Sequence, residues 1–344
     1  MKVLLVIIVV LLVTRHYGVR KNRMTPAGGI NESLYVDING TKQWISIYGR
    51  DLKNPVLLYL HGGPGSATSP YDYAFTRKWS DVYTVVTWDQ RNCGKSFDKA
   101  HEVKVITHDD MLEDGRQMTL FLLDHLSKKK ITLLGHSWGS MFGAALALNY
   151  PEYYEAFIGT GQCIDIEENE ARFCEAARKW AENDKSSQKL LEKLDPQNNL
   201  NMDYLSARGK VMKKYKYDMM KDGTDYNLWM TVLFNPYYSL SDLLTYVMNA
   251  RRSLDPYIDF FFGELKKFSL FGKYEYKIPF YNINGDMDYQ TNYELACEYF
   301  EQVKAPYKKM YVMKDATHGL LESRSSEFST IVHEIAGIQK ENSN

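Results

Sequence analysis

The sequence predicts an α/β protein with a mostly parallel sheet, helices on both faces and an inserted helical cap. Strand-like apolar runs alternate with helical stretches over residues 24–162, the first part of the expected core. Residues 163–262 are helical and polar, and strand signals return within residues 263–344. We therefore expect one sheet, built from both flanking segments, with the helical block placed over it.

The first part of the core opens with a predicted hairpin. Residues 34–38 and 44–48 flank Asn39-Gly40, a dipeptide typical of a tight turn between strands. Apolar residues recur at helical spacing over residues 109–126. Short apolar runs predict buried strands at residues 56–60, 82–88, 131–134 and 157–161. Buried strands that alternate with helices indicate a parallel sheet covered on both faces.

The second part of the core follows the cap. Strands are expected at residues 278–283 and 309–313, and a last helix at residues 327–338. In open α/β sheets, ligands bind at the carboxyl ends of the strands. An all-helical block between two strands is therefore expected to cover that edge of the sheet.

The N-terminus carries an unbroken apolar run of eleven residues, Val3 to Val13, with Lys2 before it and Arg15 after it. A helix needs about 20 apolar residues to span a bilayer. We interpret residues 1–23 as a hydrophobic anchor or signal segment. Membrane association or export is therefore expected, with a cytoplasmic location as the alternative.

Composition narrows the function classes. The formal charge is −1 over 344 residues, so nothing indicates a nucleic-acid partner. The four cysteines are scattered and lack metal-ligand spacing, so we expect no metal site and no disulfide framework. Oligomeric state is not predicted by any pattern in the chain.

The candidate nucleophile is Ser137, in the pentapeptide Gly135-His136-Ser137-Trp138-Gly139. The motif G-x-S-x-G is weak alone, but here a predicted strand precedes it and a helical stretch at residues 140–150 follows it. A serine at such a strand-to-helix turn sits in strained backbone and is exposed for attack. The alternative is a glycine-rich turn whose serine only caps the helix.

A glycine-rich loop is expected to complete an oxyanion hole. His61-Gly62-Gly63-Pro64-Gly65 directly follows the strand at residues 56–60. Acyl transfer requires donors aimed at the developing oxyanion, and the residue after the nucleophile supplies one of them. We assign these donors to the backbone N–H groups of Gly63 and Trp138.

The base and the orienting acid should follow the serine along the chain. Of the two later histidines, His318 follows a predicted strand, whereas His333 lies in the last helix. The acid should follow the strand at residues 278–283. Asp288 is preferred there over Asp286, which is expected to cap the turn, and Asp165 is a distant third.

The second strand ends in Trp88-Asp89-Gln90-Arg91-Asn92-Cys93-Gly94-Lys95-Ser96. Asp89 and Arg91 are expected to form a buried pair that braces the loops around the site. This structural role is preferred over a catalytic one.

Three motifs together resemble the proline iminopeptidase group of the α/β-hydrolase fold, the S33 serine peptidases. Residues 61–65 match its H-G-G-P-G, residues 89–96 are similar to its D-Q-R-G-x-G-x-S, and residues 135–140 to its G-x-S-W-G-S. The resemblance covers roughly residues 30–160 and 270–340. It implies a triad of Ser137, Asp288 and His318, no cofactor, and release of an N-terminal residue, often proline, from short peptides or amides.

The sequence departs from that group in two places. Asn92 replaces a glycine of the D-Q-R-G motif, although asparagine tolerates left-handed backbone. An aminopeptidase also needs carboxylates for the substrate ammonium. Glu167, Glu168 and Glu170 are candidates by position, but acidic residues also favour a helix N-terminus.

The main functional hypothesis is an aminopeptidase-like serine hydrolase that forms an acyl-enzyme with small peptides or amides. The alternative is a carboxylesterase or lactonase-type hydrolase of small apolar acyl esters, because the cap is rich in aromatic residues and methionines. A non-catalytic binding module with the same fold is a hypothesis of a different class. The expected partners are the substrate and, through residues 1–23, a membrane.

Overall fold

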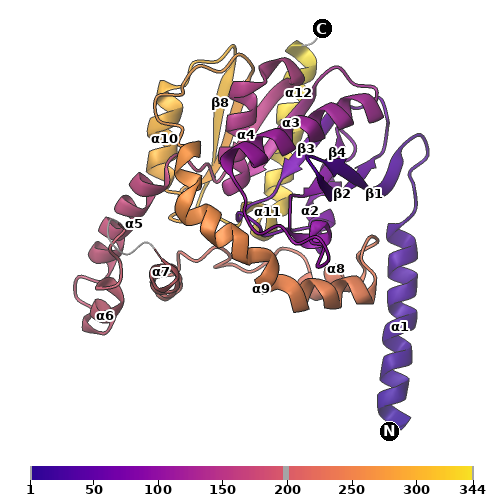
Figure 1. Ribbon diagram of the computed structural model, residues 1–344, viewed down its shortest axis with the longest axis horizontal. Helices are drawn as coiled ribbons and strands as arrows, with labels where there is room; N and C mark the ends of the chain where they lie inside the picture. The colour runs from indigo at the N-terminus through magenta and orange to yellow at the C-terminus, as the bar shows by residue number, and fades with distance from the viewer. Residues whose placement is uncertain (1, 197–200, 343–344) are drawn as a thin grey trace.

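The computed structural model describes residues 2–196 and 201–342, without the side chains of residues 2–5, 7 and 8. Residue 1 of the predicted N-terminal segment, residues 197–200 of the predicted cap and residues 343–344 lie outside the described residues. The described chain builds one eight-stranded sheet with helices on both faces (Figure 1). The predicted fold class is confirmed.

The sheet has the strand order β1-β2-β4-β3-β5-β6-β7-β8. The pairs β1·β2 and β2·β4 are antiparallel, and the other five neighbouring pairs are parallel. The strands are β1 (Ile30–Ile38), β2 (Thr41–Gly49), β3 (Val56–Leu60), β4 (Thr84–Asp89), β5 (Ile131–His136), β6 (Tyr154–Thr160), β7 (Phe280–Gly285) and β8 (Lys308–Met313). β1 begins four residues before the predicted residue 34, because the apolar pattern that predicted the strand does not include the polar residues Asn31 to Ser33.

Helices cover both faces of the sheet. On β3, Leu58 and Leu60 belong to the core on one face, whereas Leu57 and Tyr59 belong to the other, because successive strand side chains alternate. The first face is covered by α3 (His108–His125), α4 (Trp138–Asn149) and α10 (Tyr293–Gln302), and the second by α2 (Tyr73–Thr76), α11 (Leu320–Ser323) and α12 (Ser325–Asn342). Single turns of 3-10 helix lie at Arg77–Trp79, Gly94–Ser96, Pro151–Tyr153, Lys185–Ser187 and Leu265–Phe268.

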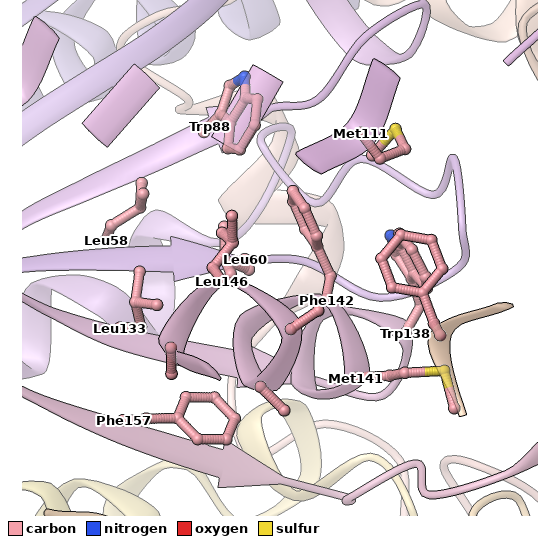
Figure 2. Packing of buried hydrophobic residues seen from close by; sticks show 14 of the residues in the cluster. Leu58, Leu60, Trp88, Met111, Leu133, Trp138, Met141, Phe142, Leu146 and Phe157 are labelled. Atoms are coloured by element: carbon pink, nitrogen blue, oxygen red, sulfur yellow. The ribbon is translucent and has the colours of Figure 1, made fainter. Parts of the chain in front are cut away.

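Helix α4 packs unusually close to the sheet because its first turns carry small residues. A Cβ on Gly139 would lie 2.1 Å from the carbonyl oxygen of Leu60, and one on Gly143 would lie 2.7 Å from the ring of Phe157. Figure 2 shows α4 lying among the apolar side chains of the strands. Trp138 also stacks on Phe142, with 5.5 Å between ring centroids. This packing fixes the start of α4, and with it the turn that carries Ser137.

Between β6 and β7 the described residues form helices and no strand. These are α5 (Ile166–Trp180), α6 (Gln188–Leu191), α7 (Met202–Lys214), α8 (Leu228–Leu233) and α9 (Leu240–Gly263). They lie together along one end of the sheet in Figure 1. Tyr257 of α9 donates a hydrogen bond to the carbonyl of Arg91 and its ring closely contacts Gly65. The helical block therefore covers loops that follow β3 and β4.

The N-terminal segment is helical, as α1 (Lys2–Asn22). Its C-terminal half is held by the end of α8 and the loop that follows: Arg15 donates to the carbonyls of Leu233 and Tyr238, and Asn22 to that of Phe234. The N-terminal half projects from the rest of the molecule in Figure 1. Among the residues that the structure describes, we find no helix with the length and apolar character needed to cross a membrane.

Candidate active site

Ser137 occupies the turn between β5 and α4, in a backbone conformation of φ +58° and ψ −123°. A residue with a side chain rarely adopts this conformation, so the turn is strained as the motif predicts. Both flanking glycines are required by close packing: a Cβ on Gly135 would lie 2.0 Å from the carbonyl oxygen of Gly139. The turn thus places Ser137 at the carboxyl end of β5.

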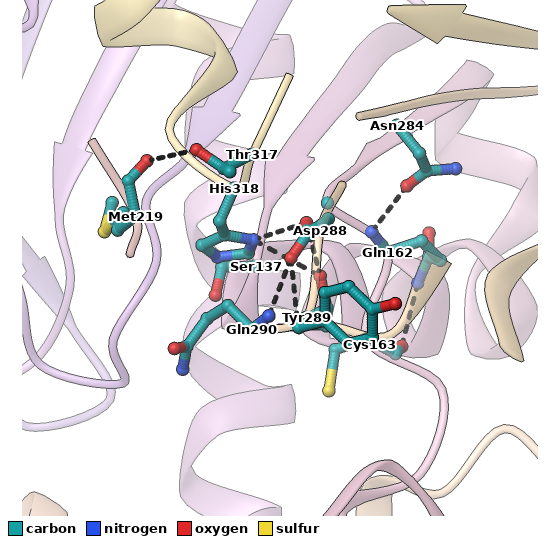
Figure 3. A network of polar contacts seen from close by, with 12 residues as sticks. Ser137, Gln162, Cys163, Met219, Asn284, Asp288, Tyr289, Gln290, Thr317 and His318 are labelled. Atoms are coloured by element: carbon teal, nitrogen blue, oxygen red, sulfur yellow. Dashed lines mark hydrogen bonds and ion pairs between the residues drawn. The ribbon is translucent and has the colours of Figure 1, made fainter. Parts of the chain in front are cut away.

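His318 and Asp288 meet at the same edge of the sheet. Their side chains are 2% and 1% exposed, and Nδ1 of His318 lies 2.7 Å from Oδ2 of Asp288. Asp288 follows β7 and His318 follows β8, and these two strands are parallel neighbours. Figure 3 shows Ser137 beside the His318 ring. The structure therefore brings together the three residues named from the sequence.

The loop after β7 keeps Asp288 ionised. Its carboxylate accepts the backbone N–H of Gln290 at 2.8 Å, and the N–H and hydroxyl of Thr291 at 3.0 Å each. Burial alone would raise the pKa of Asp288, but the charge and hydrogen bonds of His318 and Thr291 hold that pKa below its ordinary value. The carboxylate can thus orient His318 and stabilise a positive charge on it.

His136, to which no role was assigned from the sequence, contacts the backbone of the predicted base, His318. Its Nε2 lies 3.0 Å from the carbonyl oxygen of His318, and the two rings are 4.7 Å apart between centroids. Burial, together with the charge of His318, lowers the pKa of His136 to about 3. A neutral ring facing a carbonyl must carry its proton on Nε2. His136 therefore anchors the backbone of His318 without adding charge to the site.

The glycine-rich loop after β3 passes directly against the nucleophile. A Cβ on Gly62 would lie 3.1 Å from the Cβ of Ser137. Gly63 adopts φ +120°, and a side chain there would collide with the backbone N–H of Gly65. Trp138 is the first residue of α4, so its N–H has no partner within the helix. Both assigned oxyanion donors thus lie on segments adjacent to Ser137.

Gln90 ties this loop to the nucleophile turn. Its amide nitrogen donates to the carbonyl of His61 at 3.3 Å, and its carbonyl oxygen accepts the indole N–H of Trp138 at 3.0 Å. Sequence reasoning assigned no role to Gln90, although the D-Q-R motif contains it. The motif therefore braces the oxyanion loop through its glutamine.

The predicted pair of Asp89 and Arg91 is wrong. Arg91 instead binds Asp114 of α3 through two hydrogen bonds of 2.8 and 2.6 Å. Asp89 accepts from Ser69 and from the backbone N–H of Lys95. The chain leaves β4 after Asp89 and turns at Asn92, so the side chains at positions 89 and 91 reach different partners. Asn92 adopts φ +57°, the left-handed backbone expected at the position of the family's glycine.

The three candidate cap glutamates lie at the start of α5, where they differ in environment. Glu167 is exposed, and Glu168 forms an ion pair of 2.8 Å with Arg172. Glu170 is buried and forms an ion pair of 2.7 Å with Arg208 of α7. Its oxygens also accept hydrogen bonds from Asn169 and Tyr204. Glu170 alone among the three is thus built into the interior.

Arg208 links this cap helix to the acid loop. It donates to the carbonyls of Tyr289 and Gln290, at 2.9 and 3.1 Å, while it binds Glu170. These carbonyls directly follow Asp288. No sequence motif marked Arg208, since its role depends on an ion pair across 38 residues of chain.

The competing candidates lie elsewhere. Asp286 accepts the N–H of Asp315 at 2.8 Å, and Asp165 caps α5 by accepting the N–H of Glu168. His333, in α12, contacts Asp81 at 2.9 Å. Among these candidates, Asp288 and His318 are therefore the aspartate and the histidine that contact each other.

Comparisons with known proteins show the family and the fold of the chain. Residues 55–324 match the family described as alpha/beta hydrolase fold. A Bacillus subtilis (strain 168) protein named "Probable aminopeptidase YbaC" is 28% identical over 291 residues, which is 82% of this chain and 89% of that protein. A proline iminopeptidase of Clostridioides difficile is 33% identical over 127 residues, or 36% of this chain and 41% of that protein.

A solved structure shares the fold. The crystal structure of a proline iminopeptidase from Mycobacterium smegmatis superposes with a TM-score of 0.64 at 17% identity, and covers 91% of this chain and 100% of that one. The likeness in sequence thus extends through most of the relative named "Probable aminopeptidase YbaC", and the likeness in structure extends over most of the chain.

Proposed function

Because this chain belongs to the alpha/beta hydrolase fold family, we propose that it is a serine hydrolase whose triad is Ser137, His318 and Asp288. The observation that carries this proposal is the 2.7 Å contact between His318 and Asp288 beside the strained Ser137. The three residues also follow the order Ser, Asp, His along the chain that this fold uses.

The proposed reaction begins with proton transfer from the Ser137 hydroxyl to Nε2 of His318. The freed oxygen attacks the substrate carbonyl, and the buried Asp288 carboxylate stabilises the imidazolium that forms. The N–H groups of Gly63 and Trp138 donate to the oxyanion. His318 then returns the proton to the leaving amine or alcohol, which leaves an acyl group on Ser137. A water activated by His318 releases the acid product and restores the serine.

For the substrate, we propose aminopeptidase activity on small peptides or amides, of the proline iminopeptidase type. Support comes from the relative named "Probable aminopeptidase YbaC", matched over 89% of its length, and from the proline iminopeptidase matched over 41% of its length. Such an enzyme must bind the substrate's ammonium group. Glu170 is the buried carboxylate among the predicted candidates, next to the loop that holds Asp288.

One observation favours the ester alternative. Both oxygens of Glu170 already accept hydrogen bonds, from Asn169, Tyr204 and Arg208. A carboxylate so engaged would have to exchange partners to receive an ammonium group. A carboxylesterase or lactonase-type enzyme needs no such group, because its substrate is neutral.

A substrate panel separates these two proposals. Prolyl- and alanyl-arylamides would be compared with short acyl esters, using the full chain and Ser137→Ala as the control for background hydrolysis. The aminopeptidase proposal predicts arylamide turnover that the Ser137→Ala control lacks. Ester turnover without arylamide cleavage would overturn the peptidase assignment and leave the triad intact.

The proposed location is a membrane surface, because residues 1–23 carry the apolar run. Fractionation of cells that express the full chain would test this. Recovery in the membrane pellet is expected, whereas full recovery in the cytoplasmic fraction would support the alternative location.

A further inference from the structure

The N-terminal half of α1 exposes apolar side chains in every direction around its axis. The residues are Val9, Val10, Leu11, Leu12 and Val13, each between 48% and 63% exposed, and Val6 is 60% exposed. Consecutive helix residues are rotated by about 100°, so five of them complete a full turn. A protein partner packed on one side would leave the other directions in water. Apolar exposure on all sides instead fits an environment that surrounds the helix.

A second apolar surface lies on the cap. Its residues are Leu240, Leu244, Val247 and Met248 on α9, together with Trp229 on α8, and their exposed fractions range from 49% to 85%. The four α9 positions follow the spacing i, i+4, i+7, i+8 and therefore share one helix face. Several exposed apolar side chains on one helix face mark an interaction surface rather than isolated contacts with solvent.

The two surfaces are joined by direct contacts. Arg15 and Asn22 of α1 donate to the backbone carbonyls of Leu233, at the end of α8, and of Phe234 and Tyr238, between α8 and α9. Gly18 also packs against the Phe234 ring, since a Cβ there would lie 2.5 Å from it. The helix therefore leaves the body of the protein beside the segment between α8 and α9 and projects beyond it (Figure 1).

Cations border these apolar surfaces. Arg20 and Lys21, in the last turn of α1, are exposed, and so is Arg251, three residues after Met248. Exposed arginines and lysines beside an apolar surface are attracted to anionic lipid headgroups. Trp229, at 85% exposure, is also the side chain type that membrane interfaces favour.

We propose that α1 and the exposed face of α8 and α9 form one docking surface for a single leaflet of a lipid bilayer with anionic headgroups. The apolar run from Val3 to Val13 is about 16 Å long as a helix, close to half of a hydrocarbon core about 30 Å thick. The run therefore enters one leaflet, while the α9 face lies in the headgroup boundary with the cations above it.

This orientation turns the cap toward the lipid. The same helix α9 packs its Tyr257 against Gly65 of the glycine-rich loop and against Arg91. If the proposed hydrolase function holds, substrates that partition into the bilayer would meet the cap first. The docking surface itself does not depend on that function.

Vesicle flotation tests the proposal. The full chain would be mixed with vesicles of phosphatidylcholine, with or without phosphatidylglycerol, and centrifuged through a density gradient. Val247→Glu and Leu11→Glu each place a charge on the docking surface, and Val105→Glu is the matched control, since Val105 and Val247 are 71% and 70% exposed. We expect the wild type and Val105→Glu to float. Each surface variant should lower vesicle partitioning about tenfold.

Several outcomes would overturn the proposal. The wild type could stay in the dense fraction with anionic vesicles, or Val247→Glu could float as well as Val105→Glu. A wild-type dimer that Val247→Glu makes monomeric, with flotation unchanged, would show that this face joins two copies of the chain instead. Unchanged melting temperatures would establish that the variants fold. Ser137→Ala should float like the wild type, so failure of the hydrolase proposal remains distinguishable.

Discussion

The imidazole of His318 and the carboxylate of Asp288 lie 2.7 Å apart, at the carboxyl ends of two adjacent parallel strands. Asp286, two residues earlier in the same loop, turns the other way and accepts the N–H of Asp315. The two aspartates of this loop are chemically identical, but only Asp288 is placed to contact His318.

Asp288→Asn should lower kcat by roughly 10³- to 10⁴-fold, because the amide no longer holds His318 in its productive tautomer or stabilises its positive charge. Asp286→Asn is the matched control, with the same chemical change in the same loop, and should leave kcat nearly unchanged. Both variants would be assayed on the best substrate of the panel. The reverse ranking would contradict the assignment of the acid.

Ser137→Gly should be more stable than Ser137→Ala, although neither should turn over substrate. The backbone at φ +58° and ψ −123° suits glycine, whereas alanine keeps the strain of the native serine. We expect a difference of about 0.5–1 kcal/mol in the free energy of unfolding, after glycine's greater entropy loss is counted. Urea denaturation measures it. A Ser137→Gly variant less stable than Ser137→Ala by about 0.5–1 kcal/mol, the entropy cost of glycine alone, would mean that the turn stores no strain.

Arg208→Met should destabilise the protein by roughly 3–5 kcal/mol, because it leaves the buried Glu170 carboxylate without its cation. The double variant Arg208→Met/Glu170→Gln should recover part of this loss in urea denaturation. On a short acyl ester, which carries no ammonium group for Glu170 to bind, activity should stay low in both, since the carbonyls of Tyr289 and Gln290 lose their anchor beside Asp288. Full activity in the folded double variant would show that Arg208 does not position the acid loop.

Stability should depend on pH through Asp72, whose pKa is raised by burial to about 8. A carboxyl with a raised folded-state pKa contributes stability below its unfolded pKa of about 3.9, and this contribution is lost as the pH rises toward about 8. The side chain of Asp72→Asn does not ionise, so the variant does not lose this stability as the pH rises. Its stability relative to the wild type should rise by on the order of 2–4 kcal/mol between about pH 5 and pH 8. Parallel pH profiles for the wild type and variant would contradict this, and the exposed Asp222→Asn is the control.

The sheet and its edge could be predicted from sequence because both depend on local patterns. Apolar runs and glycine-rich motifs identified β3, β5 and their loops, and the order of residues along the chain was enough to propose Ser137, Asp288 and His318. The supports of the site depend on contacts between distant segments. Arg91 binds Asp114 rather than Asp89, and Arg208 reaches Glu170 and the acid loop, through partners that no spacing rule connects.

The composition of the N-terminal segment identified it as apolar, and the structure adds where the segment is attached. The run from Val3 to Val13 indicated an anchor or signal segment, whereas the hydrogen bonds of Arg15 and Asn22 attach it to the cap. Residue composition cannot reveal that attachment, because the partners are backbone carbonyls more than 200 residues away.

The most direct test of the account is covalent labelling of the folded full chain with a fluorophosphonate, followed by mass spectrometry of its peptides. We expect one phosphonyl adduct on Ser137, absent from Ser137→Ala and formed much more slowly in His318→Gln. A folded wild type that takes no label, or a label that persists in Ser137→Ala, would contradict the claim that Ser137 is the nucleophile.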